Sequence, residues 1–322
     1  PGHADAAVIR IRGTKKALAV KTDCNGRYVF LDPRVGGRIA VAEAARNVAC
    51  TGATPKAITN CLNFGNPKKP EVFFQFREAV YGMGDACRAL ETPVTGGNVS
   101  LYNENPQGAV YPTPTIGMVG LLDDAAHATR MDFTTAGDAI VLLGENTDEL
   151  GGSEYLAWIH GVVAGAPPAC DLEGEKRLIA AILEAIRAGH VRSAHDCAEG
   201  GLAVALAECC IADRTKPMGA TVDLAAWAGL APRALLFGEA QGRIVVSTPD
   251  AAAVLAVAAR HGVPARVIGS VAEAGAGLTI AGHLRLAAAT MAEAYHEALP
   301  RAMARAAAEA ITQDPALQGG AA

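Results

Sequence analysis

A paired glycine that is followed at once by polar side chains is the feature that most constrains this chain. It lies in the segment Pro93-Val94-Thr95-Gly96-Gly97-Asn98-Val99-Ser100. Glycines let backbone N–H groups come close to a phosphate, while an amide oxygen suits a hard cation and a hydroxyl suits a polar substrate. The spacing matches neither a P-loop nor the glycine pattern of a dinucleotide fold. Taken alone, the segment is more typical of a tight turn than of a ligand site.

Three further segments before residue 121 combine glycine, proline and amide side chains in equally unusual ways. They span residues 22–37, 57–67 and 111–120, and the second contains Asn60-Cys61-Leu62-Asn63-Phe64-Gly65-Asn66-Pro67. Together with 93–104, and in this order, they resemble phosphoribosylformylglycinamidine synthase subunit II, the PurL family. That family belongs to an ATP-dependent superfamily with aminoimidazole ribonucleotide synthetase and selenophosphate synthetase. The resemblance implies that the chain is the C-terminal half of such a protein.

The composition excludes several classes of protein. Its 28 Lys and Arg against 33 Asp and Glu give a formal net charge of −5, without a basic stripe suited to a nucleic-acid backbone. No apolar run reaches the roughly 18 residues of a membrane span, and no signal-peptide pattern is visible. The eight cysteines lack paired metal-binding spacing and are expected to be reduced thiols. We therefore expect a cytoplasmic protein that binds neither nucleic acid nor membrane.

The resemblance implies a PurM-like two-domain architecture of α/β and α+β class, and the pattern of apolar residues agrees with it. Residues 1–5 are small and polar and are expected to be a linker. In 6–125 short strands alternate with helices, which predicts an α/β domain, and the resemblance implies that this domain is of the ATP-binding, barrel-forming type. Residues 126–300 are expected to form an α+β domain, and 301–322 an Ala-rich tail.

Within the first domain, the sequence predicts a strand beginning at Val94 that feeds a Gly-Gly loop. A helix is predicted over 37–51, with Ile39, Val41, Ala42, Ala45 and Val48 on its apolar side and with Arg38, Glu43 and Arg46 elsewhere. The exposed sheet edges of this domain are expected to pair with an equivalent domain, or with a second copy in a dimer.

The resemblance assigns a role to four residues. Asn60 and Gly97 match the family positions that contact ATP, Asn98 matches the Mg²⁺ ligand, and Ser100 matches a contact to the substrate. Asn60 stands where the family often has aspartate, so it keeps hydrogen-bonding capacity without charge, and an Asx-turn that closes the strand is the alternative. The family's catalytic histidines match no residue here, and no catalytic residue is assigned.

Two further groups of residues have a functional and a structural interpretation. Asp23-Cys24-Asn25-Gly26 loosely resembles a turn that holds nucleotide-bound Mg²⁺ elsewhere in the superfamily, and a plain turn is the alternative. His195-Asp196, with Glu199 and Glu239 further along, has the residue types of an acid/base site. The structural interpretation is preferred there, because the resemblance implies that the cleft of the second domain is a duplicate and not the working active site.

The activity implied by the resemblance is the ATP-dependent amidation of formylglycinamide ribonucleotide to formylglycinamidine ribonucleotide. Its implied cofactors are ATP and Mg²⁺, and the ammonia comes from glutamine. The implied partners are the N-terminal half of the enzyme, a glutaminase subunit (PurQ) and a bridging subunit (PurS). Two alternatives stay open: another enzyme of the superfamily, similar to aminoimidazole ribonucleotide synthetase, and a non-catalytic nucleotide-binding or scaffold module.

Overall fold

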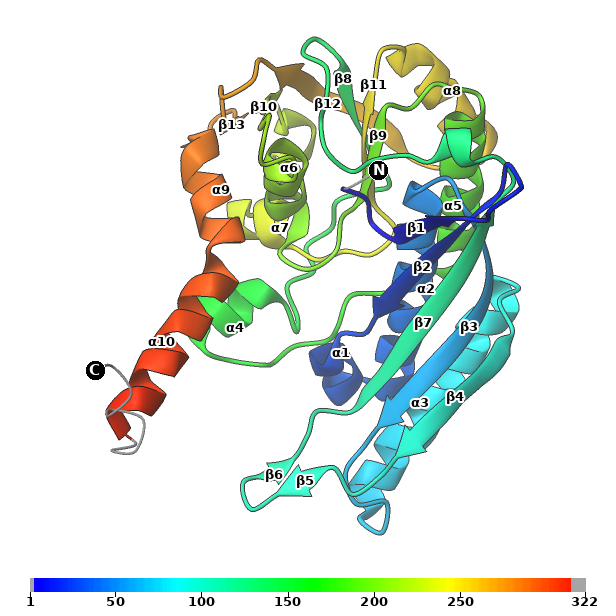
Figure 1. The fold of residues 1–322 in the computed structure, drawn as a ribbon, viewed down its shortest axis with the longest axis vertical. Coiled ribbons are helices and arrows are strands. Elements are labelled where there is room, and N and C mark those ends of the chain that lie inside the picture. Colours follow the sequence, from blue (N-terminus) through cyan, green and yellow to red (C-terminus); the bar gives the residue numbers. More distant parts are fainter. Residues whose placement is uncertain (1–2, 314–322) are drawn as a thin grey trace.

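The computed structural model describes residues 3–313, which form two consecutive units of helices and strands (Figure 1). The first unit is built on a five-stranded sheet with the strand order β1-β2-β7-β3-β4. Strands β3 and β4 run parallel, and the other neighbouring strands of this sheet are antiparallel. The strands are β1 (Ala7–Arg10), β2 (Ala17–Asp23), β3 (Thr54–Asn63), β4 (Val94–Ser100) and β7 (Thr113–Leu122).

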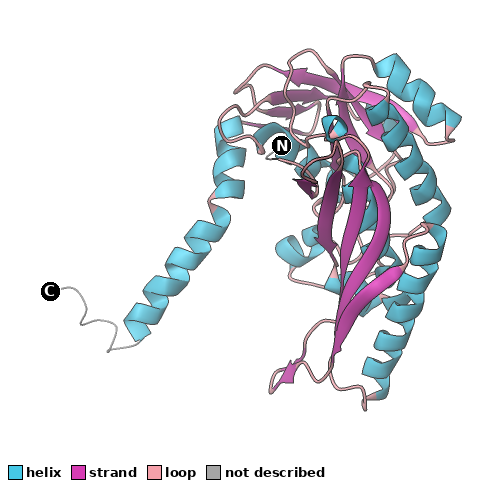
Figure 2. Ribbon diagram, turned by 45° about the vertical axis from the view of Figure 1, so that its right-hand side comes forward, coloured by secondary structure: helices cyan, strands magenta, loops and turns pink. Residues whose placement is uncertain are grey.

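Within residues 3–313, helices cover one face of this sheet and leave the other without a helix. They are α1 (Gly26–Leu31), α2 (Pro33–Cys50) and α3 (Pro70–Ala89). Strand β7 alternates between buried and half-buried residues along its whole length, as expected for a strand with one face on a core. Figure 2 shows the helices along one side of the sheet and no helix over the opposite face, which is called the open face below. A short hairpin of β5 (Glu104–Asn105) and β6 (Gly108–Ala109) extends from the end of the sheet (Figure 1).

Helix α2 is buried on nearly all sides because it lies between the first sheet and the second unit. Fifteen of its 18 residues are buried, among them Glu43 and Arg46. The sequence placed these two side chains away from the apolar stripe, but the second unit covers that side of the helix as well. The Asp32 carboxylate caps its N-terminus by accepting hydrogen bonds from the Arg34 and Val35 backbone N–H groups, with Pro33 at the first helical position.

The second unit is built on a seven-stranded sheet with the order β14-β13-β10-β12-β8-β11-β9. Central strand β8 buries Ile140 and Leu142 in one apolar cluster and Val141 and Leu143 in another. The second of these clusters also contains residues of α2 and β7, so one core crosses from the first unit into the second. A strand with a core on each face needs apolar residues at every position, which accounts for the run Ala139-Ile140-Val141-Leu142-Leu143.

The strands of the second unit are β8 (Ala139–Leu143), β9 (Ser193–Asp196), β10 (Gly219–Val222), β11 (Ile244–Thr248), β12 (Ala265–Ala272), β13 (Leu278–Ile280) and β14 (Leu284–Leu286). Its helices are α4 (Glu154–His160), α5 (Leu172–Arg187), α6 (Gly201–Ile211), α7 (Pro232–Phe237), α8 (Ala251–Arg260), α9 (Ala288–His296) and α10 (Ala298–Gln313).

Helix α10 occupies the beginning of the expected tail and extends away from the body of the molecule (Figure 2). The last residues of that expected tail, 314–322, lie outside the described part. None of the helices in 3–313 combines the length and the apolar character that crossing a membrane requires.

Candidate functional site

The Gly-Gly segment is a strand rather than a loop. Strand β4 continues to Ser100 because its backbone pairs in parallel with β3, with Gly97 opposite Asn60 and Ser100 opposite Asn63. Since β4 is the last strand of the sheet within the described chain, its outer edge has no neighbouring strand there. The residues that the sequence singled out therefore lie on two adjacent strands at one edge of the sheet.

Asn98 and Ser100 lie together on the open face. Alternate residues of a strand share a face, and the Asn98 amide nitrogen donates a hydrogen bond of 3.2 Å to the Ser100 hydroxyl oxygen. Their partners in the register are Cys61 and Asn63 of β3. Asn63 in turn donates to the Thr113 carbonyl at 3.3 Å. This end of the open face therefore presents amide and hydroxyl groups.

Asn60 lies on the other face, which the helices cover. It is paired with the fully buried Ile116 of β7, and Ile58 and Leu62, two residues before and after it, are buried as well. It is a mid-strand residue, because β3 continues to Asn63, so it does not close the strand as an Asx-turn would.

Gly97 is in direct contact with Asn60. A Cβ on Gly97 would lie 2.2 Å from both the carbonyl oxygen and the side-chain Oδ1 of Asn60, and the Gly97 φ of 151° is one that other residues rarely adopt. At Gly96, in contrast, a Cβ would meet no atom within 4 Å. The four predicted residues thus form two pairs, Asn60 with Gly97 and Asn98 with Ser100.

The Asp23–Gly26 segment forms a capped turn. The Asn25 side-chain oxygen accepts hydrogen bonds from the Arg27 and Tyr28 backbone N–H groups at 3.1 and 3.3 Å and so caps α1. Its amide nitrogen donates to Glu199 of the second unit. Burial, and then the Glu199 and Asp196 carboxylates, raise the pKa of Asp23 to about 7, against the opposing effect of Lys21. The geometry supports the structural interpretation of this turn.

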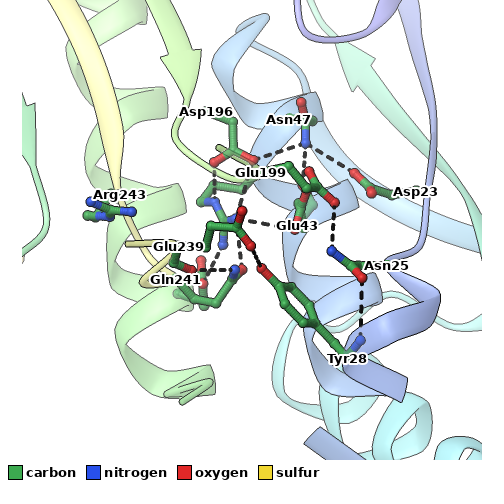
Figure 3. Close-up of polar contacts among 12 residues, drawn as sticks. Asp23, Asn25, Tyr28, Glu43, Asn47, Asp196, Glu199, Glu239, Gln241 and Arg243 are labelled. Carbon is green, nitrogen blue, oxygen red and sulfur yellow. Dashed lines mark hydrogen bonds and ion pairs between the residues drawn. The ribbon is translucent and has the colours of Figure 1, made fainter. Parts of the chain in front are cut away.

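A buried ion-pair cluster joins the two units, and we call it the Arg46 cluster (Figure 3). The Arg46 guanidinium of α2 forms ion pairs with Asp196 of β9 and Glu175 of α5, and it donates to the Gln241 side chain at 3.0 Å. Arg46 has no exposed surface. Burial, and then the carboxylates of Asp23 and Glu199, raise the pKa of the nearby Glu43 well above its ordinary value. A single cation thus serves several carboxylates at the junction of the units.

His195 and Asp196 do not form a dyad with each other. The His195 Nδ1 lies 2.7 Å from the Asp5 carboxylate and its Nε2 lies 2.9 Å from Glu208, whereas Asp196 binds Arg46. Burial by itself would lower the pKa of His195, but the Asp5 and Glu208 carboxylates raise it well above its ordinary value. A histidine that keeps its proton cannot act as a general base.

Asp5, the last residue of the expected linker, is buried and held by the second unit. One of its carboxylate oxygens contacts His195, and the other accepts the Asp196 backbone N–H at 2.6 Å. A polar cavity of about 320 Å³ adjoins these groups. Its lining includes Lys21, Glu43, Asn47, Glu199 and Tyr295. None of the four residues assigned to ATP, Mg²⁺ or substrate lines this cavity.

Glu239 contacts Tyr28 of α1 in the first unit (Figure 3) and two helix starts of the second unit. One of its carboxylate oxygens accepts the Tyr28 hydroxyl, and the other accepts the backbone N–H groups of Glu154 and Gly200, both at 2.8 Å. Arg243 is also fully buried and donates to backbone carbonyls of Gly238 and Ala240. These bonds support the structural interpretation that was preferred for Glu239.

Comparison with known families matches both units. The model of the AIR synthase related protein N-terminal domain matches residues 3–122, and the model of the C-terminal domain matches residues 135–280. The chain belongs to the AIR synthase related family. This agrees with the two-domain α/β architecture that was expected.

The curated relatives are proteins named phosphoribosylformylglycinamidine synthase subunit PurL. That of Chlorobium luteolum is 55% identical over 313 residues, which are 94% of this chain and 41% of the relative. That of Moorella thermoacetica is 53% identical over 305 residues, again 94% of this chain and 41% of the relative. The expected resemblance to PurL is confirmed, and the chain spans about two fifths of the length of these relatives.

Solved structures confirm the fold. Thermotoga maritima PurL complexed with FGAR has a TM-score of 0.76 at 21% identity, over 90% of this chain and 48% of that chain. The same protein complexed with ATP has a TM-score of 0.71 at 22% identity, over 89% of this chain and 46% of that chain.

Proposed function

We propose that this family member is the part of a phosphoribosylformylglycinamidine synthase that supplies one wall of its ATP site. The observation that carries the proposal is the 55% identity over 313 residues to a PurL protein. The proposed reaction is the ligation of ammonia to formylglycinamide ribonucleotide. The amide oxygen of this substrate attacks the γ-phosphate of ATP and releases ADP. Ammonia then displaces the phosphate to give formylglycinamidine ribonucleotide. This assigns the chain to the ATP-dependent C–N ligases of purine biosynthesis, acting in the cytoplasm.

In this proposal ATP lies across the outer edge of β4. Asn60 and Gly97 are on the helix-covered side of the strand, and Asn98 and Ser100 are on the open side. A ligand that contacts both pairs therefore has to pass over the outer edge of β4. The exposure of Gly97 and Asn98 leaves room for such a ligand. Backbone groups at this edge would position the phosphates, and positioning is the main contribution of a protein to phosphoryl transfer.

Asn98 would provide a ligand to Mg²⁺, and Ser100 would contact the substrate. The hydrogen bond between them uses the Asn98 amide nitrogen, so the amide oxygen is the atom that suits a hard cation. Bound Mg²⁺ would neutralise charge on the transferred phosphoryl group. Magnesium sites usually include one or two carboxylates besides the substrate phosphates. The register partners of Asn98 and Ser100 are Cys61 and Asn63, so we propose that the carboxylate ligands come from outside this chain.

The proposed partners follow from the same relatives. The segment that corresponds to the rest of their length would complete the site and supply the catalytic histidines. It would lie against the open face and the edge of β4, where a second copy would bind in its absence. A solved neighbour is described as the structure of PurLQS from Thermotoga maritima. We therefore propose a glutaminase subunit (PurQ) and a bridging subunit (PurS) as further partners, which deliver ammonia released from glutamine.

The test is ammonia-dependent ADP release, measured with the chain alone and together with the segment that corresponds to the rest of the relatives. We expect no turnover by the chain alone and turnover by the combination. Asn98→Ala should lower the rate of the combination about 10²-fold, as the loss of one electrostatic contact to a transition state typically does. Asn105→Ala, in the exposed β5–β6 hairpin, is the matched control and should leave the rate unchanged.

Two results would refute the proposal. Turnover by the chain alone would mean that the active site lies within it, away from the edge of β4. Saturable ATP binding without any turnover in the combination would favour a non-catalytic nucleotide-binding module instead.

A further inference from the structure

Tyr102 has a backbone conformation that is costly for its side chain. Its φ is 61°, in the left-handed region, where a bulky aromatic residue is an outlier. Among the described residues, Glu91 is the other non-glycine residue with a positive φ. Glu91 directly follows the C-cap of α3, a place where this conformation is common. Tyr102 lies instead between β4 and β5, two residues after Ser100.

Hydrogen bonds hold Tyr102 in this conformation. Its backbone N–H donates to the Gly65 carbonyl at 2.9 Å, and its carbonyl accepts from the Glu104 N–H at 2.9 Å. The Asn103 side chain donates to the Ser100 carbonyl at 2.7 Å. The turn is therefore joined both to the end of β4 and to the turn that follows β3. A glycine or an asparagine would meet these backbone requirements with less strain.

Within the described residues, Tyr102 belongs to neither apolar cluster, so core packing does not account for its aromatic ring. Tyr102 is 54% exposed, and Val99, three residues before it, is 52% exposed. Backbone strain of this kind persists where the surrounding structure imposes it, and it is found most often at ligand sites. An exposed aromatic ring is well suited to stack on a planar ring.

We propose that Tyr102 provides the surface on which the purine base of the nucleotide stacks. The inference rests on the proposed function, because it places the base beyond the end of β4, next to the residues assigned to the phosphates, the cation and the substrate. Stacking of a base on an aromatic side chain tolerates different bases, because each has a flat π face. Tyr102 would then contribute to affinity for the nucleotide through its base and not through its phosphates.

The test compares ATP with inorganic tripolyphosphate, both measured by titration calorimetry in the presence of Mg²⁺ on the chain combined with the segment that corresponds to the rest of the relatives. Tyr102→Asn removes the ring and keeps a residue that tolerates the left-handed conformation. We expect it to weaken ATP binding about ten-fold or more, to leave tripolyphosphate binding unchanged, and to leave the melting temperature equal or higher. Tyr102→Phe keeps the ring and should bind ATP like the wild type. Glu91→Asn is the matched control, because it relieves the same kind of backbone strain at a position away from the site, and it should not alter ATP binding.

Several results would overturn the inference. If Tyr102→Asn binds ATP as tightly as the wild type, the ring does not stack on the base. If this variant also changes its oligomeric state, the Tyr102 ring contacts a protein instead. If the variant melts lower and loses both ligands equally, Tyr102 has a structural role. If the wild type binds ATP and tripolyphosphate equally tightly, the base makes no contribution. If the folded wild type binds neither ligand, the proposed ATP site fails, and the stacking fails with it.

Discussion

Replacing Gly97 by alanine should destabilise the chain even in the absence of any ligand. The new methyl group would lie 2.2 Å from the carbonyl oxygen of Asn60, far inside van der Waals contact. The Asn60 side chain can rotate away, but its carbonyl belongs to the backbone of β3, which is paired on both sides. The φ of 151° adds strain for any residue with a Cβ.

These two effects give the expected magnitude. A non-glycine residue in such a conformation costs about 1–3 kcal/mol, and overpacking of one methyl group costs about 1–3 kcal/mol. Their sum is about 2–6 kcal/mol, a large part of the 5–15 kcal/mol that stabilises a typical protein. We expect the lower part of this range, because β4 is an edge strand and can shift outward at the cost of its pairing with β3. At roughly 2 °C per kcal/mol, the melting temperature should fall by about 5 °C.

Gly96→Ala is the matched control, because the same methyl group one residue earlier meets no atom within 4 Å. Thermal unfolding followed by circular dichroism, without nucleotide, should separate the two variants clearly. Equal melting temperatures would refute the steric argument. A stable Gly97→Ala that fails only in ATP-dependent turnover would mean that the glycine is required by the ligand and not by Asn60.

Three further predictions concern the junction of the two units. Asp23→Asn should flatten the pH dependence of stability. The folded chain holds the Asp23 proton to about pH 7, whereas the unfolded chain releases it near 3.8, so the free energy of unfolding of the wild type falls as the pH rises between these values. Urea titrations at several pH values would show this difference between wild type and variant. Arg46→Met should lower the free energy of unfolding in urea by about 3–5 kcal/mol, because it leaves buried carboxylates without their cation. The control Arg38→Met breaks a partly exposed ion pair and should lower it by less than about 1 kcal/mol. Tyr28→Phe should cost about 1–3 kcal/mol in the same assay, since the buried Glu239 carboxylate loses a donor, and an unchanged stability would contradict that bond.

Local sequence patterns predicted much of the first unit because its elements alternate regularly. The helix predicted over 37–51 overlaps the observed α2, and the strand predicted to begin at Val94 begins there as β4. The strand through Gly96 and Gly97 was missed, because paired glycines are typical of turns and only the backbone of β3 holds them in a strand.

The division of the candidate site into two faces could not be predicted from the sequence. Whether Asn60 points to the helices or to the open face depends on the register between β3 and β7, and a shift of one residue would reverse it. Arg46 was likewise expected away from the apolar stripe of its helix. Its burial depends on α5 and β9, whose carboxylates lie more than a hundred residues away in sequence.

The Arg46 cluster also determines how this protein can be divided. A shorter version that ends near residue 125 would keep Arg46 in an apolar helix and lose both Glu175 and Asp196, and the complementary piece would keep those two acids without their cation. Each piece would also lose part of the apolar core that α2 shares with α5 and β8. The two family domains are thus separate in sequence but not interchangeable parts. A second domain taken from another member of the family would pack against α2 only if it placed two carboxylates beside Arg46, as Glu175 and Asp196 do here.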